Sequence, residues 1–148
     1  PLEDRLEVVG VVNGITFIND TLATIPQATI AALDSLNDKK ITLILGGFDR
    51  GIDFNILGQD ISQRENVLNV ITIGQTGPQI IKSLNRVGYR GNIINLKQKP
   101  MNKIVKNAFR NTPKGGVVLL SPASTSFDMF KDYKDRGDQF RNAVKELN

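Results

Sequence analysis

Three short segments carry the side chains that could bind a charged ligand, and each follows an apolar run. The aspartate segment (residues 19–26) leads into a predicted helix start, where unpaired N–H groups favour anions. The arginine segment (residues 46–53) holds two adjacent glycines and Arg50, whose planar guanidinium suits a carboxylate or a phosphate. The serine segment (residues 121–128) places four hydroxyls between a strand and a helix, which is typical of an anion-binding loop. Together they indicate an anionic ligand.

Each segment also has a simpler interpretation that these residues alone leave open. Thr24, with Gln27 three positions on, has the form of a helix capping box. In the arginine segment, Arg50 could simply pair with a neighbouring aspartate on the surface. In the serine segment, Thr125 or Ser126 could simply cap the final helix. The nucleotide fingerprints GxGxxG and GxxxxGK[ST] do not occur in the sequence.

The sequence contains neither histidine nor cysteine, which excludes several kinds of chemistry. Zinc sites of the usual Cys/His type, thiolate nucleophiles and imidazole bases are all ruled out. A serine nucleophile would lack an imidazole to activate it. Any chemistry must therefore use carboxylates, Lys or Arg side chains, hydroxyls or backbone groups, and we expect no metal site.

Charge is unevenly distributed along the 148 residues, whose net charge is +4. Residues 1–65 carry 5 basic and 10 acidic side chains, whereas residues 66–127 carry 9 basic and no acidic ones. The basic block suggests either a polyanion-binding surface or a solvated face. We favour the solvated face and expect no nucleic-acid partner, because aromatic side chains are few. No apolar run is long enough to cross a bilayer, and we expect no membrane partner.

Hydrophobic periodicity predicts an α/β domain spanning residues 1–148. Asn13-Gly14 between two apolar runs predicts a hairpin with a type I′ turn. Strands alternating with helices then predict a Rossmann-like, doubly wound, mostly parallel sheet of about six strands with helices on both faces. In such sheets ligands bind beyond the carboxyl ends of the strands, so the three segments should converge there. The predicted strands are 8–12, 15–19, 41–45, 67–73, 92–96 and 117–120, and the predicted helices are 25–37, 54–64, 78–87, 100–110 and 127–146.

In their order and spacing, these motifs resemble the C-terminal domain of MurD-type Mur ligases along essentially the whole chain. The serine-proline motif and the arginine-glycine tail are the most specific of them. The matching stretches are Arg5-Leu6-Glu7, Asn19–Thr24 (NDTLAT), Gly46–Phe54 (GGFDRGIDF), Leu119–Phe130 (LLSPASTSFDMF), Tyr133 and Arg136–Phe140 (RGDQF).

The resemblance implies part of a cytoplasmic, ATP-dependent amide ligase that adds glutamate to UDP-MurNAc-L-Ala in peptidoglycan synthesis. ATP phosphorylates the precursor's carboxyl group, and the amine of glutamate then attacks the acyl phosphate. ATP and Mg²⁺ are expected to be bound mainly by a central domain, and the precursor by an N-terminal domain. This domain would bind glutamate and close over ATP. Lacking a P-loop and an initiator Met, the chain is expected to be a piece of a longer protein and inactive alone.

The resemblance also assigns site residues by position. Five positions match those that hold glutamate, where a cation and hydroxyls can neutralise two carboxylates and leave the amine exposed. Three more match the nucleotide side of the site. The glutamate-binding candidates are Thr24, Arg50, Ser126, Phe127 and Tyr133, and the nucleotide-binding candidates are Arg5, Asn19 and Asp20.

Four positions depart from the family pattern. Asp4 stands where the family usually has His, Leu22 and Arg50 where it has Lys, and Ile25 where it has Asn. The chain resembles a subgroup that adds L-glutamate, and D-glutamate stays open. Two rival interpretations are a non-catalytic amino-acid or polyanion-binding module on this fold and a Mur ligase with another substrate. The serine-proline segment argues against the second.

Overall fold

A computed structural model describes residues 2–147, which form one six-stranded sheet with five helices. The strand order is β1-β2-β6-β3-β4-β5, and only β1 and β2 run antiparallel. The predicted Rossmann-like architecture is confirmed. The strands are β1 (Glu7–Val12), β2 (Ile15–Asn19), β3 (Ile41–Leu45), β4 (Val67–Ile73), β5 (Asn92–Lys97) and β6 (Val117–Leu120); the helices are α1 (Pro26–Asp34), α2 (Asn55–Ser62), α3 (Gly77–Arg86), α4 (Met101–Asn111) and α5 (Tyr133–Lys145).

The hairpin turn forms as predicted, because Asn13 and Gly14 both adopt positive φ angles, 49° and 78°. These are the left-handed conformations that a two-residue type I′ turn requires. The turn returns β2 to the sheet interior, where it pairs in parallel with β6. It therefore brings the end of β2 beside the ends of β6 and β3.

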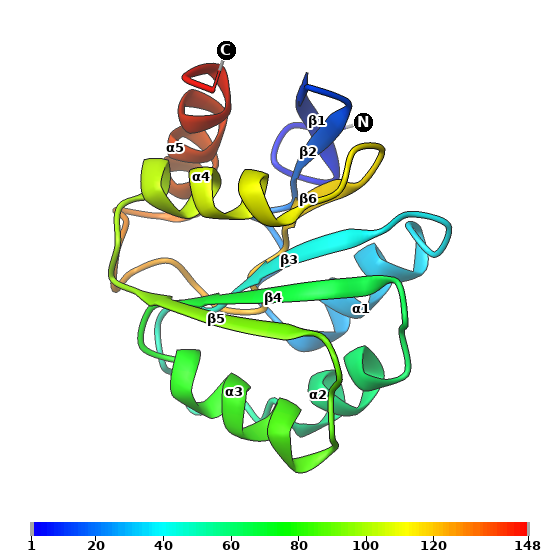
Figure 1. Cartoon of the computed structure of the whole chain (residues 1–148). Coiled ribbons are helices and arrows are strands. Elements are labelled where there is room, and N and C mark those ends of the chain that lie inside the picture. The colour runs from blue at the N-terminus through cyan, green and yellow to red at the C-terminus, as the bar shows by residue number, and fades with distance from the viewer. Residues whose placement is uncertain (1, 148) are drawn as a thin grey trace.

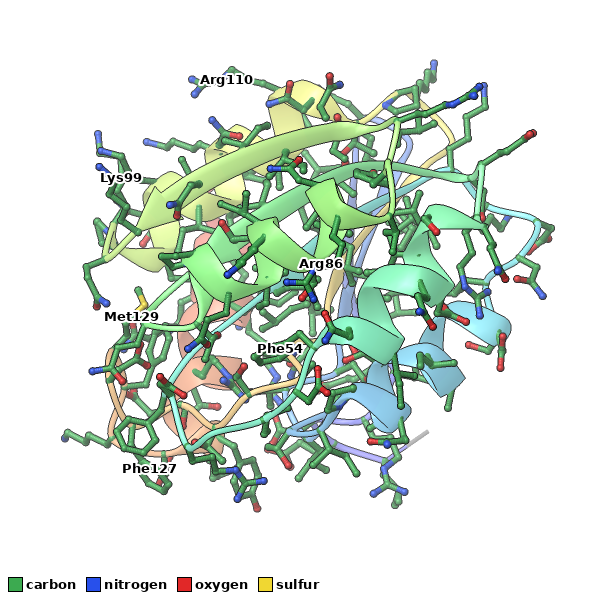
Figure 2. All side chains as sticks on the ribbon, turned by 90° about the horizontal axis from the view of Figure 1, so that it is seen from below. Phe54, Arg86, Lys99, Arg110, Phe127 and Met129 are labelled. Atoms are coloured by element: carbon green, nitrogen blue, oxygen red, sulfur yellow. The ribbon has the colours of Figure 1, made fainter. Side chains whose placement is uncertain are left out.

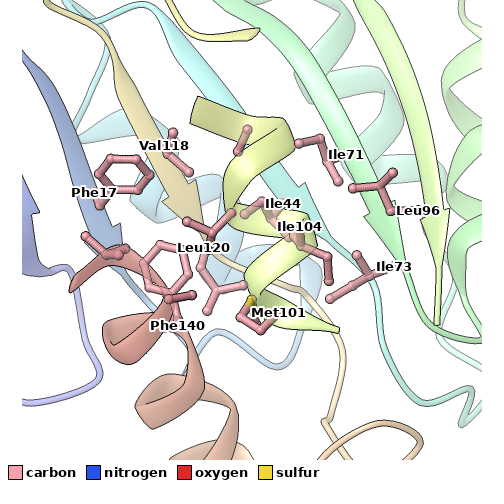
Figure 3. Packing of buried hydrophobic residues seen from close by; sticks show 14 of the residues in the cluster. Phe17, Ile44, Ile71, Ile73, Leu96, Met101, Ile104, Val118, Leu120 and Phe140 are labelled. Carbon is pink, nitrogen blue, oxygen red and sulfur yellow. The ribbon is translucent and has the colours of Figure 1, made fainter. Parts of the chain in front are cut away.

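Helices cover both faces of the sheet, with α1, α2 and α3 on one side and α4 and α5 on the other (Figure 1). Both layers have an apolar core, and the one under α4 and α5 includes Phe17, Ile104 and Phe140 (Figure 3). Because both faces are covered, every residue of β3 and β6 is buried. This explains why these two strands are almost entirely apolar in sequence.

The caps predicted for two helices are absent, and one of these helices begins six residues later than predicted. α1 starts at Pro26 after Ile25, and no side chain caps it, so the predicted Thr24 capping box is wrong. α5 starts at Tyr133 rather than near residue 127, and its N-cap is Asp132, whose carboxylate accepts from the backbone N–H of Asp135 at 2.8 Å. Neither Thr125 nor Ser126 caps it. The serine segment is consequently a loop over its whole length.

The basic side chains of residues 66–127 spread over α3, α4, β5 and the adjoining loops, where Lys99 and Arg110 project outward (Figure 2). None of these nine side chains forms an ion pair with any residue of 2–147. Within that same range, no helix is long and apolar enough to cross a membrane.

Candidate functional site

The aspartate and serine segments are joined along the carboxyl ends of β2 and β6. The backbone N–H of Asp20 donates to the carbonyl of Leu120 at 2.8 Å, and that of Ala123 donates to the carbonyl of Ala23 at 2.8 Å. The Ser121 hydroxyl donates to the Asp20 carboxylate at 2.8 Å. Parallel pairing of the two strands places these loops side by side, and hydrogen bonds then hold them together.

The arginine segment joins the serine segment in the same way. The backbone N–H of Gly46 donates to the carbonyl of Pro122 at 2.9 Å, and that of Phe48 donates to the carbonyl of Thr125 at 2.8 Å. The rings of Phe48 and Phe127 meet edge to face with centroids 6.4 Å apart. All three segments therefore meet at one edge of the sheet, as predicted.

A fourth loop, after β4, supports this edge and was not predicted. The Thr76 hydroxyl accepts from the backbone N–H of Gly47 at 2.9 Å and lies 3.2 Å from the Ser124 hydroxyl. In the same loop, the backbone N–H of Gln75 donates to the Asp128 carboxylate at 2.8 Å. The loop thus braces the arginine and serine segments from the β4 side.

Arg136 of α5 crosslinks two of the segments from within the core. Its fully buried guanidinium donates to the Thr21 hydroxyl at 2.8 Å, the Thr21 carbonyl at 2.8 Å and the Ser124 carbonyl at 2.9 Å. Burial lowers the pKa of Arg136 to about 10, partly offset by the charge of Asp128, so the side chain stays protonated at neutral pH. The tail motif in the sequence includes this arginine, but the motif alone does not indicate its structural role.

Two hydroxyls assigned to glutamate, those of Thr24 and Ser126, form no hydrogen bond among residues 2–147. Ser126 is 2% exposed, and its hydroxyl and that of Thr125 make no hydrogen bond among residues 2–147. Thr24 is half-buried, and no hydrogen bond from its side chain is found in the same range. Buried hydroxyls normally find partners. The Ser126 hydroxyl has almost no exposed surface in this conformation and would have to turn outward to donate to a ligand.

Arg50 is exposed and forms no ion pair within residues 2–147, so the predicted surface pair with a neighbouring aspartate is wrong. Both neighbouring carboxylates are engaged elsewhere. Asp49 accepts from the backbone N–H of Gly51 at 3.0 Å, and Asp53 accepts from that of Asn55 at 2.8 Å. The Arg50 guanidinium is therefore left to interact with another anion.

The two aromatic candidates lie at the outer rim of this edge. Phe127 is 63% exposed and projects from the surface, and Tyr133 is 44% exposed at the start of α5 (Figure 2 for Phe127). The backbone of Tyr133 is fixed, because its carbonyl accepts from the Thr21 hydroxyl at 3.0 Å. Phe127 thus lies beside the arginine segment through its contact with Phe48, and Tyr133 lies beside the aspartate segment through its bond to Thr21.

Arg5 and Asp20, two of the nucleotide candidates, line one hollow of about 240 Å³. Burial raises the pKa of the Asp20 carboxyl. Hydrogen bonds from the Ser121 hydroxyl and the Leu6 backbone, together with the positive charge of Arg5, lower it and offset part of this rise. The remainder of the hollow is mainly apolar. Its other lining residues are Leu6, Leu22, Ala23, Ala28, Ala31 and Ala32.

Asn19, the third nucleotide candidate, is fully buried and bonded inside the domain. Its amide nitrogen donates to the Asp4 carboxylate at 2.9 Å and to the Glu7 carboxylate at 3.3 Å. Its amide oxygen accepts from the backbone N–H of Thr21 at 3.2 Å. The structure thus places Asn19 where it shapes the aspartate segment rather than where it faces solvent.

Comparison with protein families matches residues 4–124 to the model described as "Mur ligase, glutamate ligase domain". The match covers most of the chain and includes the aspartate and arginine segments. The chain belongs to the C-terminal domain family of the Mur ligases. The family resemblance drawn from the motifs is confirmed.

Curated relatives of this Mur ligase domain carry names for both glutamate isomers. The chain is 42% identical to the UDP-N-acetylmuramoylalanine--D-glutamate ligase of Acetivibrio thermocellus, covering 99% of this chain and 32% of the relative. It is 35% identical to the UDP-N-acetylmuramoyl-L-alanine--L-glutamate ligase of Salinispora tropica, covering 98% of this chain and 31% of the relative. The chain therefore spans about a third of the length of these enzymes.

Solved structures agree on the fold of the Mur ligase domain. UDP-N-acetylmuramate-alanine ligase from Thermotoga maritima superposes with a TM-score of 0.64 at 15% identity, covering 99% of this chain and 31% of that one. Bifunctional folylpolyglutamate synthase/dihydrofolate synthase from Yersinia pestis, solved with AMPPNP and a manganese ion, superposes with a TM-score of 0.61 at 16% identity, covering 99% and 32%.

Proposed function

We propose that this chain is the glutamate-binding domain of an ATP-dependent amide ligase that adds glutamate to UDP-MurNAc-L-Ala in peptidoglycan synthesis. One observation supports this most. Three segments far apart in sequence meet at one sheet edge, where the hydroxyl of Ser126 is buried without a partner and Arg50 has no ion pair among residues 2–147. Such an edge suits a small ligand with two carboxylates.

Glutamate is anchored in this proposal through both of its carboxylates. Arg50 binds one of them with its planar guanidinium, which matches carboxylate geometry. Thr24 and Ser126 donate hydroxyl protons to the ligand's carboxylate oxygens. The rings of Phe127 and Tyr133 cover the ligand's aliphatic stem. Anchoring at both ends leaves the amine free and holds it in one position for attack.

The hollow lined by Arg5 and Asp20 would contact one part of the ATP molecule. Arg5 would meet the phosphates and Asp20 the ribose hydroxyls, while Asn19 acts on the nucleotide only by shaping the aspartate segment. When bound in the whole enzyme, ATP supplies the phosphoryl group that activates the precursor's carboxyl group. We assign no Mg²⁺ ligand to this domain. The remaining ATP and Mg²⁺ contacts belong in this proposal to other domains of the full-length protein.

The role of this domain is positioning rather than proton transfer. The amine of glutamate forms a C–N bond with the activated carbonyl carbon while the C–O bond to phosphate breaks. The products are the amide, inorganic phosphate and ADP, and the amine proton passes to solvent or to another part of the enzyme. The residues assigned here to glutamate offer a guanidinium, hydroxyls and aromatic rings, and none is a carboxylate or an imidazole.

The decisive test is a ligation assay of the full-length protein with UDP-MurNAc-L-Ala, ATP and either D- or L-glutamate. We expect ADP release and product formation with one isomer and little with the other. The relatives named for each isomer make the parallel assay necessary. ADP release that depends on a different amino acid, with neither glutamate isomer accepted, would overturn the proposed substrate. An absence of any ATP-dependent ligation would favour a non-catalytic binding module.

A further inference from the structure

The residue before Arg5 is buried against α5, although it is an aspartate. Asp4 is 4% exposed, and one of its carboxylate oxygens lies 2.7 Å from the guanidinium of Arg141. The same Arg141 nitrogen lies 2.8 Å from the Glu7 carboxylate. Arg141 therefore holds two acidic side chains that flank Arg5 in the sequence.

The surface of α5 is shaped to receive the Asp4 carboxylate. Gly137 lies one helical turn before Arg141, and a Cβ atom there would collide with Asp4 Oδ1. The amide of Asn19 donates to the same oxygen at 2.9 Å. Gly137 leaves room for this carboxylate, and Arg141 and Asn19 donate to it. We call these three residues the seat of Asp4.

The backbone on each side of Arg5 is hydrogen-bonded to the aspartate segment. The carbonyl of Asp4 accepts from the backbone N–H of Leu22 at 3.2 Å, and the backbone N–H of Leu6 donates to Asp20 at 3.1 Å. Asp4 and Leu6 have φ angles of 65° and 44°, in the left-handed region that side chains other than glycine disfavour. Such conformations persist only where surrounding contacts impose them.

Arg141 is the cation that faces the Asp4 carboxylate. Within residues 2–147 it is the only basic side chain at ion-pair distance from Asp4. A buried carboxylate that loses its charged partner tends to move toward water. If Asp4 moved, the adjoining backbone would move with it. Arg5 would then be displaced from the hollow that it lines together with Asp20.

We infer that Arg141 is a positioning residue which, through Asp4, holds the backbone from which Arg5 reaches the nucleotide. The inference rests on the proposed function, because it takes the hollow beside Arg5 as the place where ATP binds. It also accounts for an aspartate at the position where the family pattern usually has histidine. The arginine on α5 supplies the partner that this aspartate needs.

The test is a double-mutant cycle in the full-length ligase, with KM for ATP, KM for glutamate and kcat measured for Arg5→Ala, Arg141→Ala and the double variant. We expect each single variant to raise KM for ATP about tenfold, because Arg5→Ala removes a charged contact to the phosphates and Arg141→Ala displaces it. KM for glutamate should change less than about twofold, and the double variant should be no worse than Arg5→Ala alone.

Lys134→Ala is the matched control, because Lys134 also lies on α5 and binds the N-terminal segment through Glu3, but in an exposed pair. It should leave KM for ATP unchanged. If Arg141→Ala destabilises the fold, Asp4→Ala with Arg141→Ala removes the buried charge together with its partner and should still raise KM for ATP.

Two outcomes separate the inference from the proposed function. An unchanged KM for ATP in Arg5→Ala would reject the nucleotide assignment itself. A raised KM in Arg5→Ala with normal values in both Arg141 variants would reject only the positioning role. Effects of Arg5→Ala and Arg141→Ala that multiply in the double variant would also reject it, since they would show that the two residues act independently.

Discussion

Replacing Arg136 by methionine should destabilise the chain, because this arginine ties the aspartate segment to the serine segment from inside the core. Methionine approximates the length of the side chain and fills its space. It removes all three hydrogen bonds that the guanidinium donates to Thr21 and Ser124. The substitution therefore tests whether the buried arginine stabilises the edge that we assign to glutamate.

The expected loss can be worked from the atoms left without donors. The carbonyls of Thr21 and Ser124 lose their arginine partner, whereas the Thr21 hydroxyl keeps its bond to Tyr133. Each orphaned buried acceptor costs about 1–3 kcal/mol. Burying a charged guanidinium costs desolvation free energy, and burying methionine does not. This difference offsets part of the loss. We therefore expect the free energy of unfolding to fall by about 2–4 kcal/mol.

Urea unfolding of the 148-residue chain, followed by circular dichroism, measures this loss directly. Arg110→Met on α4 is the control, because Arg110 is exposed and has no ion pair among residues 2–147. It should change the free energy by less than about 0.5 kcal/mol. An Arg136→Met variant as stable as this control would refute the reasoning.

Three further outcomes are expected. Gly46→Ala should cost about 3 kcal/mol in urea unfolding, because its φ is 115° and a Cβ would collide with the Ile73 carbonyl. Gly51→Ala, with φ 80° and no atom within 4 Å, should cost about 1 kcal/mol, and equal losses would contradict the steric argument. Burial raises the pKa of Asp20, so the unfolded chain ionises first and stability falls as pH rises from about 3.9 through the folded pKa. Asp20→Asn should abolish this decline in urea midpoints measured across the acid range, and an unaltered slope would count against it. Tyr133→Ala should raise KM for glutamate about fivefold and Tyr133→Phe should not, as expected for a ring contact; equal effects would instead assign the role to the hydroxyl.

The sequence predicts the sheet well because its strands are determined by burial. β3, β4 and β6 have the predicted bounds, since apolar runs between loop signals leave little freedom when both faces are covered. The start of α5 was misplaced because Phe130 has helical spacing from later apolar residues. Phe130 instead packs on the core from a loop, and Asp132 begins the helix.

The support for the site was largely invisible in sequence. Arg136 bonds the hydroxyl and the carbonyl of Thr21, 115 positions away, and no residue pattern records such contacts. Arg141 and Asp4 meet across 137 positions through a gap that Gly137 provides. Side chains that act on distant backbone or on each other become identifiable only once the chain is folded.

Loss of the Arg50 guanidinium tests the central claim most directly. The assay compares Arg50→Ala with Arg90→Ala in the full-length ligase, and Arg90 is a matched exposed arginine outside the three segments. A charged hydrogen bond contributes about 1.5–3 kcal/mol, so KM for glutamate should rise about 10- to 100-fold in Arg50→Ala and stay unchanged in Arg90→Ala. KM for ATP should be unaffected in both. A glutamate KM that is the same in Arg50→Ala as in the unsubstituted enzyme would contradict the account.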